Sequence, residues 1–143
     1  FAFAWGVLLG AVSIQDSWPS VAILCLYAGT ICWIIGYDTI YAIQDKLDDE
    51  QLGIGSAALS FGQNLQSGVA ILYAAALILW ATGFFLHAGI DIWLTGWAGG
   101  LCHLVWQIIK LGSVSSADAL RLFKSNRDCG LIIAGGLVLQ III

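Results

Sequence analysis

Residues 21–50, VAILCLYAGTICWIIGYDTIYAIQDKLDDE, decide the fold of this chain. The first part, Val21 to Gly36, is apolar and carries no charge. The second part, Tyr37 to Glu50, holds six charged residues of a 143-residue chain that has only five basic and nine acidic ones. An apolar run that ends abruptly in charge predicts a membrane-spanning helix whose charged end lies at the membrane surface.

Three aspartates of this stretch would share one face if the helix continued through them. At about 100° per residue, Asp38, Asp45 and Asp49 fall at roughly 0°, 340° and 20°. Carboxylates placed in this way repel one another, and a bound cation relieves the repulsion. Mg²⁺ takes one or two carboxylates together with oxygens of a phosphorylated substrate, so Asp45 and Asp49 predict a metal–diphosphate site. A solvated acidic loop at the end of a membrane helix explains the same spacing equally well.

The composition is that of a membrane protein. Hydrophobic residues make up 60% of the chain and charged residues 10%, against about 25% charged in soluble domains. The length leaves room for about five spans of about 20 residues each. A net charge of −4 with five basic residues argues against nucleic acid as a partner. The four cysteines lack the spacing of a metal site and are expected to be buried free thiols.

We therefore expect an all-α, multi-pass transmembrane helical bundle. The expected spans are residues 1–14, as the end of a truncated span, then 21–36, 67–90, 92–109 and 129–143. Residues 51–66 are expected to form an interfacial loop or short helix over the site. Residues 110–128 are expected to form a polar loop with a short amphipathic piece at 117–123. Gly96 and Gly100, four residues apart, are expected to pack against another helix.

The basic residues predict the orientation of the bundle. Lys46 follows the second span, and the other four follow the fourth span: Lys110, Arg121, Lys124 and Arg127. The connections at residues 15–20 and 87–91 carry no Lys or Arg. By the positive-inside rule, the aspartate motif and the basic segment both face the cytoplasm.

The aspartate stretch also resembles a known family. Residues 37–62, YDTIYAIQDKLDDEQLGIGSAALSFG, resemble the second aspartate-rich motif and the following loop of the UbiA superfamily of intramembrane aromatic prenyltransferases. Within them, YDTxYAxQDxxDD resembles the 4-hydroxybenzoate polyprenyltransferase branch. Residues 120–132, LRLFKSNRDCGLI, resemble the last cytoplasmic loop of the family, and FAFAWGVLLGA at the start also resembles it.

The resemblance implies a Mg²⁺-dependent transfer of a polyprenyl group from polyprenyl diphosphate to the ring of 4-hydroxybenzoate, in ubiquinone synthesis. The enzyme would lie in the bilayer of the cytoplasmic membrane, or of the mitochondrial inner membrane in a eukaryote. By resemblance, Asp45 and Asp49 are the metal ligands and Asp38 is a further catalytic acid. Contacts to the substrates are expected from four more residues: Tyr41, Gln44, Lys46 and Arg127.

In this family a first motif, N-x-x-x-D-x-x-x-D, lies on an earlier helix and holds a second metal. These 143 residues do not contain it. We therefore expect residues 1–143 to be the C-terminal half of a UbiA-like domain whose N-terminal half is missing, and to be inactive alone.

Other interpretations stay open. Another UbiA-type enzyme, of the menaquinone, haem or homogentisate branch, would share the aspartates, although such relatives often carry an acid where this chain has Ala42. A cation transporter module would be expected to have an ionisable residue deep in a span, which only His103 provides. His103 is expected to bond a neighbouring carbonyl or hydroxyl rather than act as a base. Asn126 and Arg127 are expected to open the last helix on the side of the aspartates, as a topology anchor or a phosphate contact.

Overall fold

The computed structural model describes residues 2–15, 18–44 and 61–143, and all of the regular structure in these residues is helical. Short 3-10 helices, η1 (Ala2–Ala4) and η2 (Gly62–Asn64), precede two of the α-helices. The α-helices are α1 (Trp5–Gln15), α2 (Val21–Tyr41), α5 (Leu65–Ala88), α6 (Trp93–Leu111) and α7 (Ser116–Ile142). The predicted all-α bundle is confirmed.

Two of these helices, α2 and α5, are long and apolar enough to cross a membrane, by length and composition among the described residues. Helix α1 is apolar but shorter. Helices α6 and α7, with 19 and 27 residues, are long enough to cross a membrane. They are less apolar, because polar residues such as Gln107 and Asn126 lie within them. Each of the five expected spans corresponds to a helix, and α2 and α5 are the two that are both long and apolar enough to cross a membrane, among the described residues.

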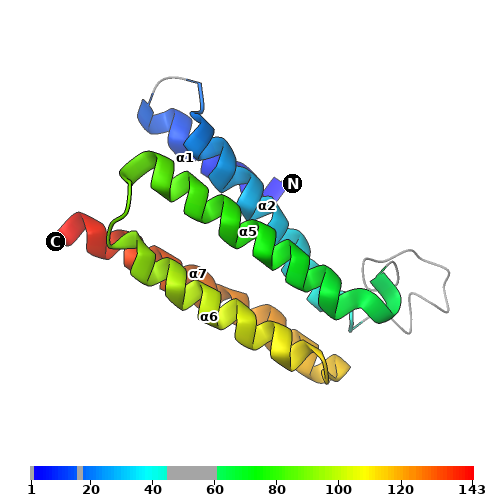
Figure 1. Cartoon of the computed structure of the whole chain (residues 1–143). Coiled ribbons are helices and arrows are strands. Elements are labelled where there is room, and N and C mark those ends of the chain that lie inside the picture. Colours follow the sequence, from blue (N-terminus) through cyan, green and yellow to red (C-terminus); the bar gives the residue numbers. More distant parts are fainter. Residues whose placement is uncertain (1, 16–17, 45–60) are drawn as a thin grey trace.

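The helices form two antiparallel pairs, α2 with α5 and α6 with α7, which lie against each other (Figure 1). Glycines on α2 accept large side chains of α5. A Cβ atom on Gly36 would lie 2.5 Å from Cε1 of Tyr73, and one on Gly29 would lie 2.7 Å from Cδ1 of Trp80. The rings of Tyr73 and Trp80 thus fill the space that these glycines leave, and both rings belong to the core.

Gly96 and Gly100 pack α6 against α7, as predicted. A Cβ atom on Gly96 would lie 2.8 Å from the carbonyl oxygen of Ile133, and one on Gly100 would lie 2.9 Å from the Ile133 side chain. Small residues at such positions allow two helix backbones to approach closely, which drives helix association within a bilayer.

Two expected boundaries are wrong. Residues 116–128 belong to helix α7 and are not a polar loop, because Ala119 and Leu122 bury an apolar face in the core. The Ser115 hydroxyl caps this helix by accepting a hydrogen bond from the Asp118 amide at 3.2 Å. Helix α2 ends at Tyr41, and a turn follows at residues 42–43. The expected shared face of Asp38, Asp45 and Asp49 lies partly outside the described residues, since these end at residue 44 here.

The four cysteines are free thiols, but only Cys129 is fully buried. Cys25 and Cys32 are half-buried, and Cys102 is exposed on the outside of the bundle. The prediction of free thiols is confirmed, whereas the prediction that all are buried is wrong.

One end of the bundle gathers the charged residues of the described part of the chain, with the exception of Asp91. The end of α2, the start of α5, the end of α6 and the start of α7 all lie there (Figure 1). This arrangement brings Asp38 to the same end as the basic residues of the α6–α7 region: Lys110, Arg121, Lys124 and Arg127. Among the described residues, Lys and Arg therefore lie at one end of the bundle and not at the other, as the predicted orientation requires.

Candidate functional site

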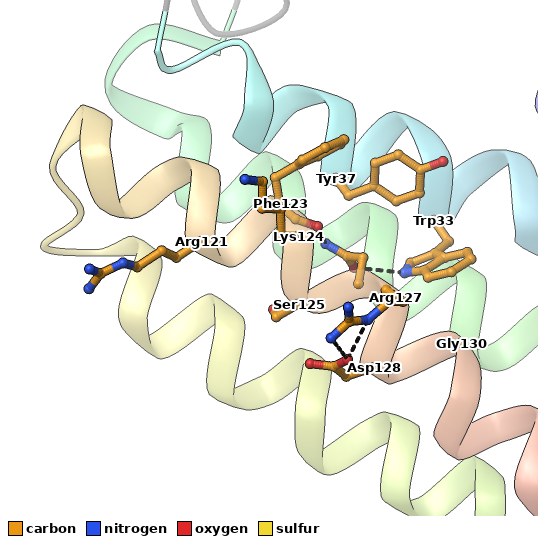
Figure 2. Close-up of a pocket in the computed structure, with 10 residues that line it drawn as sticks. Trp33, Tyr37, Arg121, Phe123, Lys124, Ser125, Arg127, Asp128 and Gly130 are labelled. Atoms are coloured by element: carbon orange, nitrogen blue, oxygen red, sulfur yellow. Dashed lines mark hydrogen bonds and ion pairs between the residues drawn. The ribbon is translucent and has the colours of Figure 1, made fainter.

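A pocket of about 720 Å³ opens between the last turns of α2 and the first half of α7. Its lining residues come from only these two helices (Figure 2): Trp33, Tyr37, Arg121, Phe123, Lys124, Ser125, Asn126, Arg127, Asp128 and Gly130. The pocket therefore lies between the helix that leads into the aspartate motif and the helix that carries most of the basic residues.

Aromatic rings form one wall of the pocket. The Tyr37 ring lies edge-on to Trp33, with centroids 5.3 Å apart and planes at 83°, and edge-on to Phe123 at 5.6 Å and 66°. The Tyr41 ring contacts Phe123 at 4.9 Å. Edge-to-face contacts of this kind are the favoured geometry of aromatic pairs. They leave ring faces and edges available to a flat aromatic ligand.

Cationic groups lie on the other side of the pocket. Arg127 is exposed, and its Nε and Nη2 donate to Oδ1 of Asp128 at 2.9 and 2.8 Å, as drawn in Figure 2. Arg121 points away from the aromatic wall (Figure 2), with its Nη1 3.8 Å from Oδ1 of Asp118. Exposed ion pairs contribute about 0–1 kcal/mol, so Arg127 can exchange Asp128 for an anionic ligand at little cost.

A hydrogen-bonded cluster of polar side chains lies beneath the pocket. Oδ1 of Asn126 accepts a hydrogen bond from Nε1 of Trp33 at 3.0 Å, and the Tyr73 hydroxyl lies 3.4 Å from the same oxygen. The Tyr73 hydroxyl also donates to Oε1 of Gln107 at 2.8 Å. Tyr73, Gln107 and Asn126 are all buried, so these bonds satisfy polar groups that would otherwise be costly in an apolar bundle.

The cluster continues to His103 on α6. Nε2 of Gln107 donates to Oγ of Ser125 at 2.8 Å, and Nε2 of His103 lies 3.3 Å from that oxygen. The Ser125 hydroxyl in turn donates to the carbonyl of Leu122 at 2.8 Å. His103 thus contacts a neighbouring hydroxyl, as the sequence predicted, and it is not a pocket residue.

The predicted site residues fall into two groups. Asp45, Lys46 and Asp49 lie outside the described residues. The other four are described: Asp38, Tyr41, Gln44 and Arg127.

Of these four, the structure brings Tyr41 and Arg127 to the pocket region, Tyr41 through Phe123 and Arg127 as a lining residue. Asp38 is exposed on α2, about 100° around the helix from the pocket residue Tyr37. Gln44 follows the end of α2, and its Nε2 is buried without a hydrogen-bond partner among the described residues.

Asn126 does not open the last helix, contrary to our expectation, because α7 begins at Ser116. It lies well inside α7 and is 4% exposed, because its amide is bonded to the Trp33 indole. The pocket residues Trp33 and Tyr37 were missed, because an aromatic ring in an apolar span also suits simple packing. The polar side chains of Gln107 and Asn126 in apolar surroundings were the available signal.

The described residues test a metal site only in part. They contain no cluster of three or more His, Cys, Asp and Glu side chains that could hold a metal ion. Asp38 offers one exposed carboxylate, a ligand type suited to a hard divalent cation such as Mg²⁺. Asp38 thus fits such an ion as a single ligand, and further carboxylates would have to come from residues 45–60.

Comparisons with known proteins give consistent results. The UbiA prenyltransferase family matches residues 1–127. The chain is 42% identical over 139 residues to a protein of Drosophila melanogaster named 4-hydroxybenzoate polyprenyltransferase, mitochondrial. It is 38% identical over 141 residues to a protein of the same name from Arabidopsis thaliana. It is 30% identical over 139 residues to 4-hydroxybenzoate octaprenyltransferase of Cronobacter sakazakii.

These alignments cover 96%, 94% and 97% of the chain, but only 35%, 33% and 48% of the relatives. The chain thus spans about a third to a half of the length of the curated relatives it matches. No solved structure matches the chain.

Proposed function

Because the chain belongs to the UbiA prenyltransferase family, we propose that it forms part of a 4-hydroxybenzoate polyprenyltransferase. The whole enzyme would transfer a polyprenyl group from its diphosphate to the ring of 4-hydroxybenzoate, in ubiquinone synthesis. The names of the relatives support the choice of acceptor. The observation that carries the chemistry is the pocket between α2 and α7, with an aromatic wall and a cationic side.

The diphosphate end of the site is assigned to the segment that follows α2. Members of this family are generally metal-dependent, and we propose Mg²⁺ held by Asp45 and Asp49, with Asp38 nearby. When bound, Mg²⁺ would neutralise the charge that develops on the departing diphosphate. Tyr41, Gln44 and Lys46 would contact the diphosphate or the metal ligands.

The acceptor end of the site is assigned to the pocket. An allylic cation requires a nucleophilic carbon, and a phenol activates the ring position ortho to its hydroxyl. The rings of Trp33, Tyr37 and Phe123 suit the flat face of such an acceptor. Its carboxylate would bind Arg127, whose planar guanidinium offers paired donors to a carboxylate.

The position of the site also suits a lipid substrate. A long isoprenoid chain dissolves only in the bilayer, and the pocket opens at the charged end of a bundle that has apolar helices. We propose that this end faces the cytoplasm, or the matrix side of the mitochondrial inner membrane, as the positive-inside rule predicts.

The transporter hypothesis has less support. It requires an ionisable side chain deep in a span. Among the described residues, no Asp, Glu, Lys, Arg or His side chain is buried. His103 is only partly buried and contacts Ser125.

A substrate panel tests the proposal. The full-length protein in detergent or nanodiscs would receive a long-chain polyprenyl diphosphate, Mg²⁺ and one of three acceptors: 4-hydroxybenzoate, homogentisate or dihydroxynaphthoate. We expect product with 4-hydroxybenzoate and little with the others. Preference for another acceptor would move the enzyme to a different UbiA branch, and no transfer to any acceptor would contradict the enzymatic assignment.

A further inference from the structure

Asn126 joins three helices around one amide group. Its Nδ2 donates to carbonyl oxygens of its own helix, those of Leu122 at 3.3 Å and Phe123 at 3.1 Å. Because carbonyl oxygens only accept and the Trp33 indole N–H only donates, the orientation of the amide is fixed. Oδ1 therefore points away from α7, toward Trp33 of α2 and Tyr73 of α5.

The bond between Trp33 and Asn126 is the only side-chain hydrogen bond that links α2 to α7 among the described residues. The other close contacts between these helices at the pocket are aromatic pairs with Phe123, edge-on for Tyr37 and tilted for Tyr41. Aromatic pairs tolerate sliding and tilting, whereas a hydrogen bond of 3.0 Å between the partly buried Trp33 indole and the buried Asn126 amide does not. The relative register of the two helices therefore depends on Asn126.

Register matters here because the two helices carry different halves of the proposed chemistry. Arg127 and Lys124 line the pocket from α7, while Tyr37 lines it from α2, just before the aspartate motif. A shift of α7 by one helical turn would move its side chains by about 5.4 Å relative to α2. Such a shift would displace the Arg127 guanidinium from an acceptor held against the aromatic wall.

We propose that Asn126 is a positioning residue, which anchors the Trp33 indole and thereby sets the register at which Arg127 and the aromatic wall face each other. The inference rests on the proposed function for its kinetic consequence, but the register itself can be measured without any substrate.

The kinetic test compares two variants of the full-length protein. Asn126→Leu keeps the side-chain size but removes the acceptor for Trp33. We expect the KM for 4-hydroxybenzoate to rise about tenfold, the equivalent of about 1.4 kcal/mol, with little change in kcat or in the KM for polyprenyl diphosphate. An unchanged KM for 4-hydroxybenzoate would overturn the proposal.

A matched control removes a similar bond away from the pocket. Nε1 of Trp80 donates to Oγ1 of Thr30 at 3.3 Å, which links α5 to α2. Thr30→Val should lower the melting temperature without changing either KM. If Thr30→Val raised the KM for 4-hydroxybenzoate as Asn126→Leu does, the effect would be a general loss of packing and the positioning role would be wrong.

A double-mutant cycle asks whether Asn126 acts through Trp33. Trp33→Phe keeps a ring but removes the N–H donor, and it should raise the KM for 4-hydroxybenzoate by a similar factor. Asn126→Leu should then add no further increase, because contacting residues in one hydrogen bond are not additive. Multiplied effects would mean that Asn126 and Trp33 act independently of each other, which contradicts a positioning role through Trp33.

Cysteine crosslinking reads the register directly. The four native cysteines are replaced by alanine, and single cysteines are placed at Tyr37 with either Phe123 or Arg127. With Asn126 present, a short reagent with two thiol-reactive maleimide groups should join positions 37 and 123 in preference to 37 and 127. In Asn126→Leu that preference should be lost, and a preference that is kept would overturn the proposal.

The kinetic assay and the crosslinking assay distinguish a failure of the proposed function from a failure of the proposed role of Asn126. Absence of prenyl transfer from the unmodified full-length protein contradicts the proposed function, and the crosslinking result then still supports or overturns the register role of Asn126.

Discussion

Helix α7 contacts its two neighbours in different ways. Against α6 the backbones themselves meet, since a Cβ atom on Gly136 would lie 2.5 Å from Cα of Gly96. Against α2 the contact is made by long side chains, through the bond from Trp33 to Asn126 and the aromatic contact of Tyr37 with Phe123. The contact with α6 joins two backbones and borders a hollow of about 690 Å³ lined by uncharged residues, whereas the contact with α2 borders the pocket of about 720 Å³ that holds the charged side chains.

Different parts of α7 therefore have different roles: Gly136 packs the helix against α6, and residues within 121–130 line the pocket. In a bilayer, helices associate through close packing and hydrogen bonds, because the lipid is as apolar as the side chains. The glycine contact of α7 with α6 supplies close packing, and the polar cluster around Gln107 and Asn126 supplies hydrogen bonds. Charged residues gather only at the pocket end of α7, from Asp118 to Asp128.

The largest effect is expected at the charged end. In the full-length enzyme, Asp45→Asn or Asp49→Asn should lower turnover at least about 100-fold, because about 3 kcal/mol of charge stabilisation in the transition state is lost. Asp91→Asn is the control at the opposite end of the bundle, where Asp91 accepts from Gln140 at 3.1 Å, and it should keep full turnover. Full activity of either motif variant would contradict the metal assignment.

The glycine contact gives a matched pair of neighbouring positions. Gly136→Ala should lower the free energy of unfolding by about 2 kcal/mol, because overpacking costs about 1–3 kcal/mol and the nearest atoms belong to the α6 backbone. Gly135→Ala, which meets nothing within 4 Å, should be neutral or slightly stabilising. Unfolding in detergent measures both, and equal effects would mean that α6 and α7 lie farther apart.

The sequence predicted the helices better than their ends. Uncharged apolar runs of the length of a span indicate where α2 and α5 lie. The start of α7 was missed because residues 116–128 look polar as a whole, although Ala119 and Leu122 bury one face. The end of α2 at Tyr41 was missed because neither glycine nor proline marks it.

The site was predicted in part. Arg127 was proposed as one of the basic residues available to an anionic substrate, and it lies in the pocket. The pairing of Trp33 with Asn126 joins residues 93 positions apart, and nothing in the local sequence specifies such a partner. Burial of Asn126 follows from the packing of α7 on α2 and α5, which a single sequence does not give.

A smaller effect is expected at the cationic side of the pocket. Arg127→Gln in the full-length enzyme should raise the KM for 4-hydroxybenzoate about tenfold, because an ionic contact to the carboxylate is replaced by a neutral one. Lys110→Gln removes a cation from the same end of the bundle but outside the pocket lining, and should leave that KM unchanged. Equal effects would indicate general electrostatic attraction rather than a contact by Arg127.

The smallest effect concerns the partner of Arg127. Asp128 competes with an anionic acceptor for this guanidinium, and both side chains are exposed, 78% for Arg127 and 48% for Asp128. Exposed pairs contribute about 0–1 kcal/mol, so Asp128→Asn should lower the KM for 4-hydroxybenzoate by about twofold. Asp118→Asn is the control, since Asp118 pairs with Arg121 at 3.8 Å on the same helix.

The salt dependence separates competition by Asp128 from a change in the fold. If Asp128 competes for Arg127, added salt screens the pair and the difference between wild type and Asp128→Asn shrinks. A raised KM in Asp128→Asn would show that Asp128 holds Arg127 in the orientation that the acceptor needs. Asp128 would then fix the position of the Arg127 side chain, as the backbone of α6 fixes the position of α7 at Gly136.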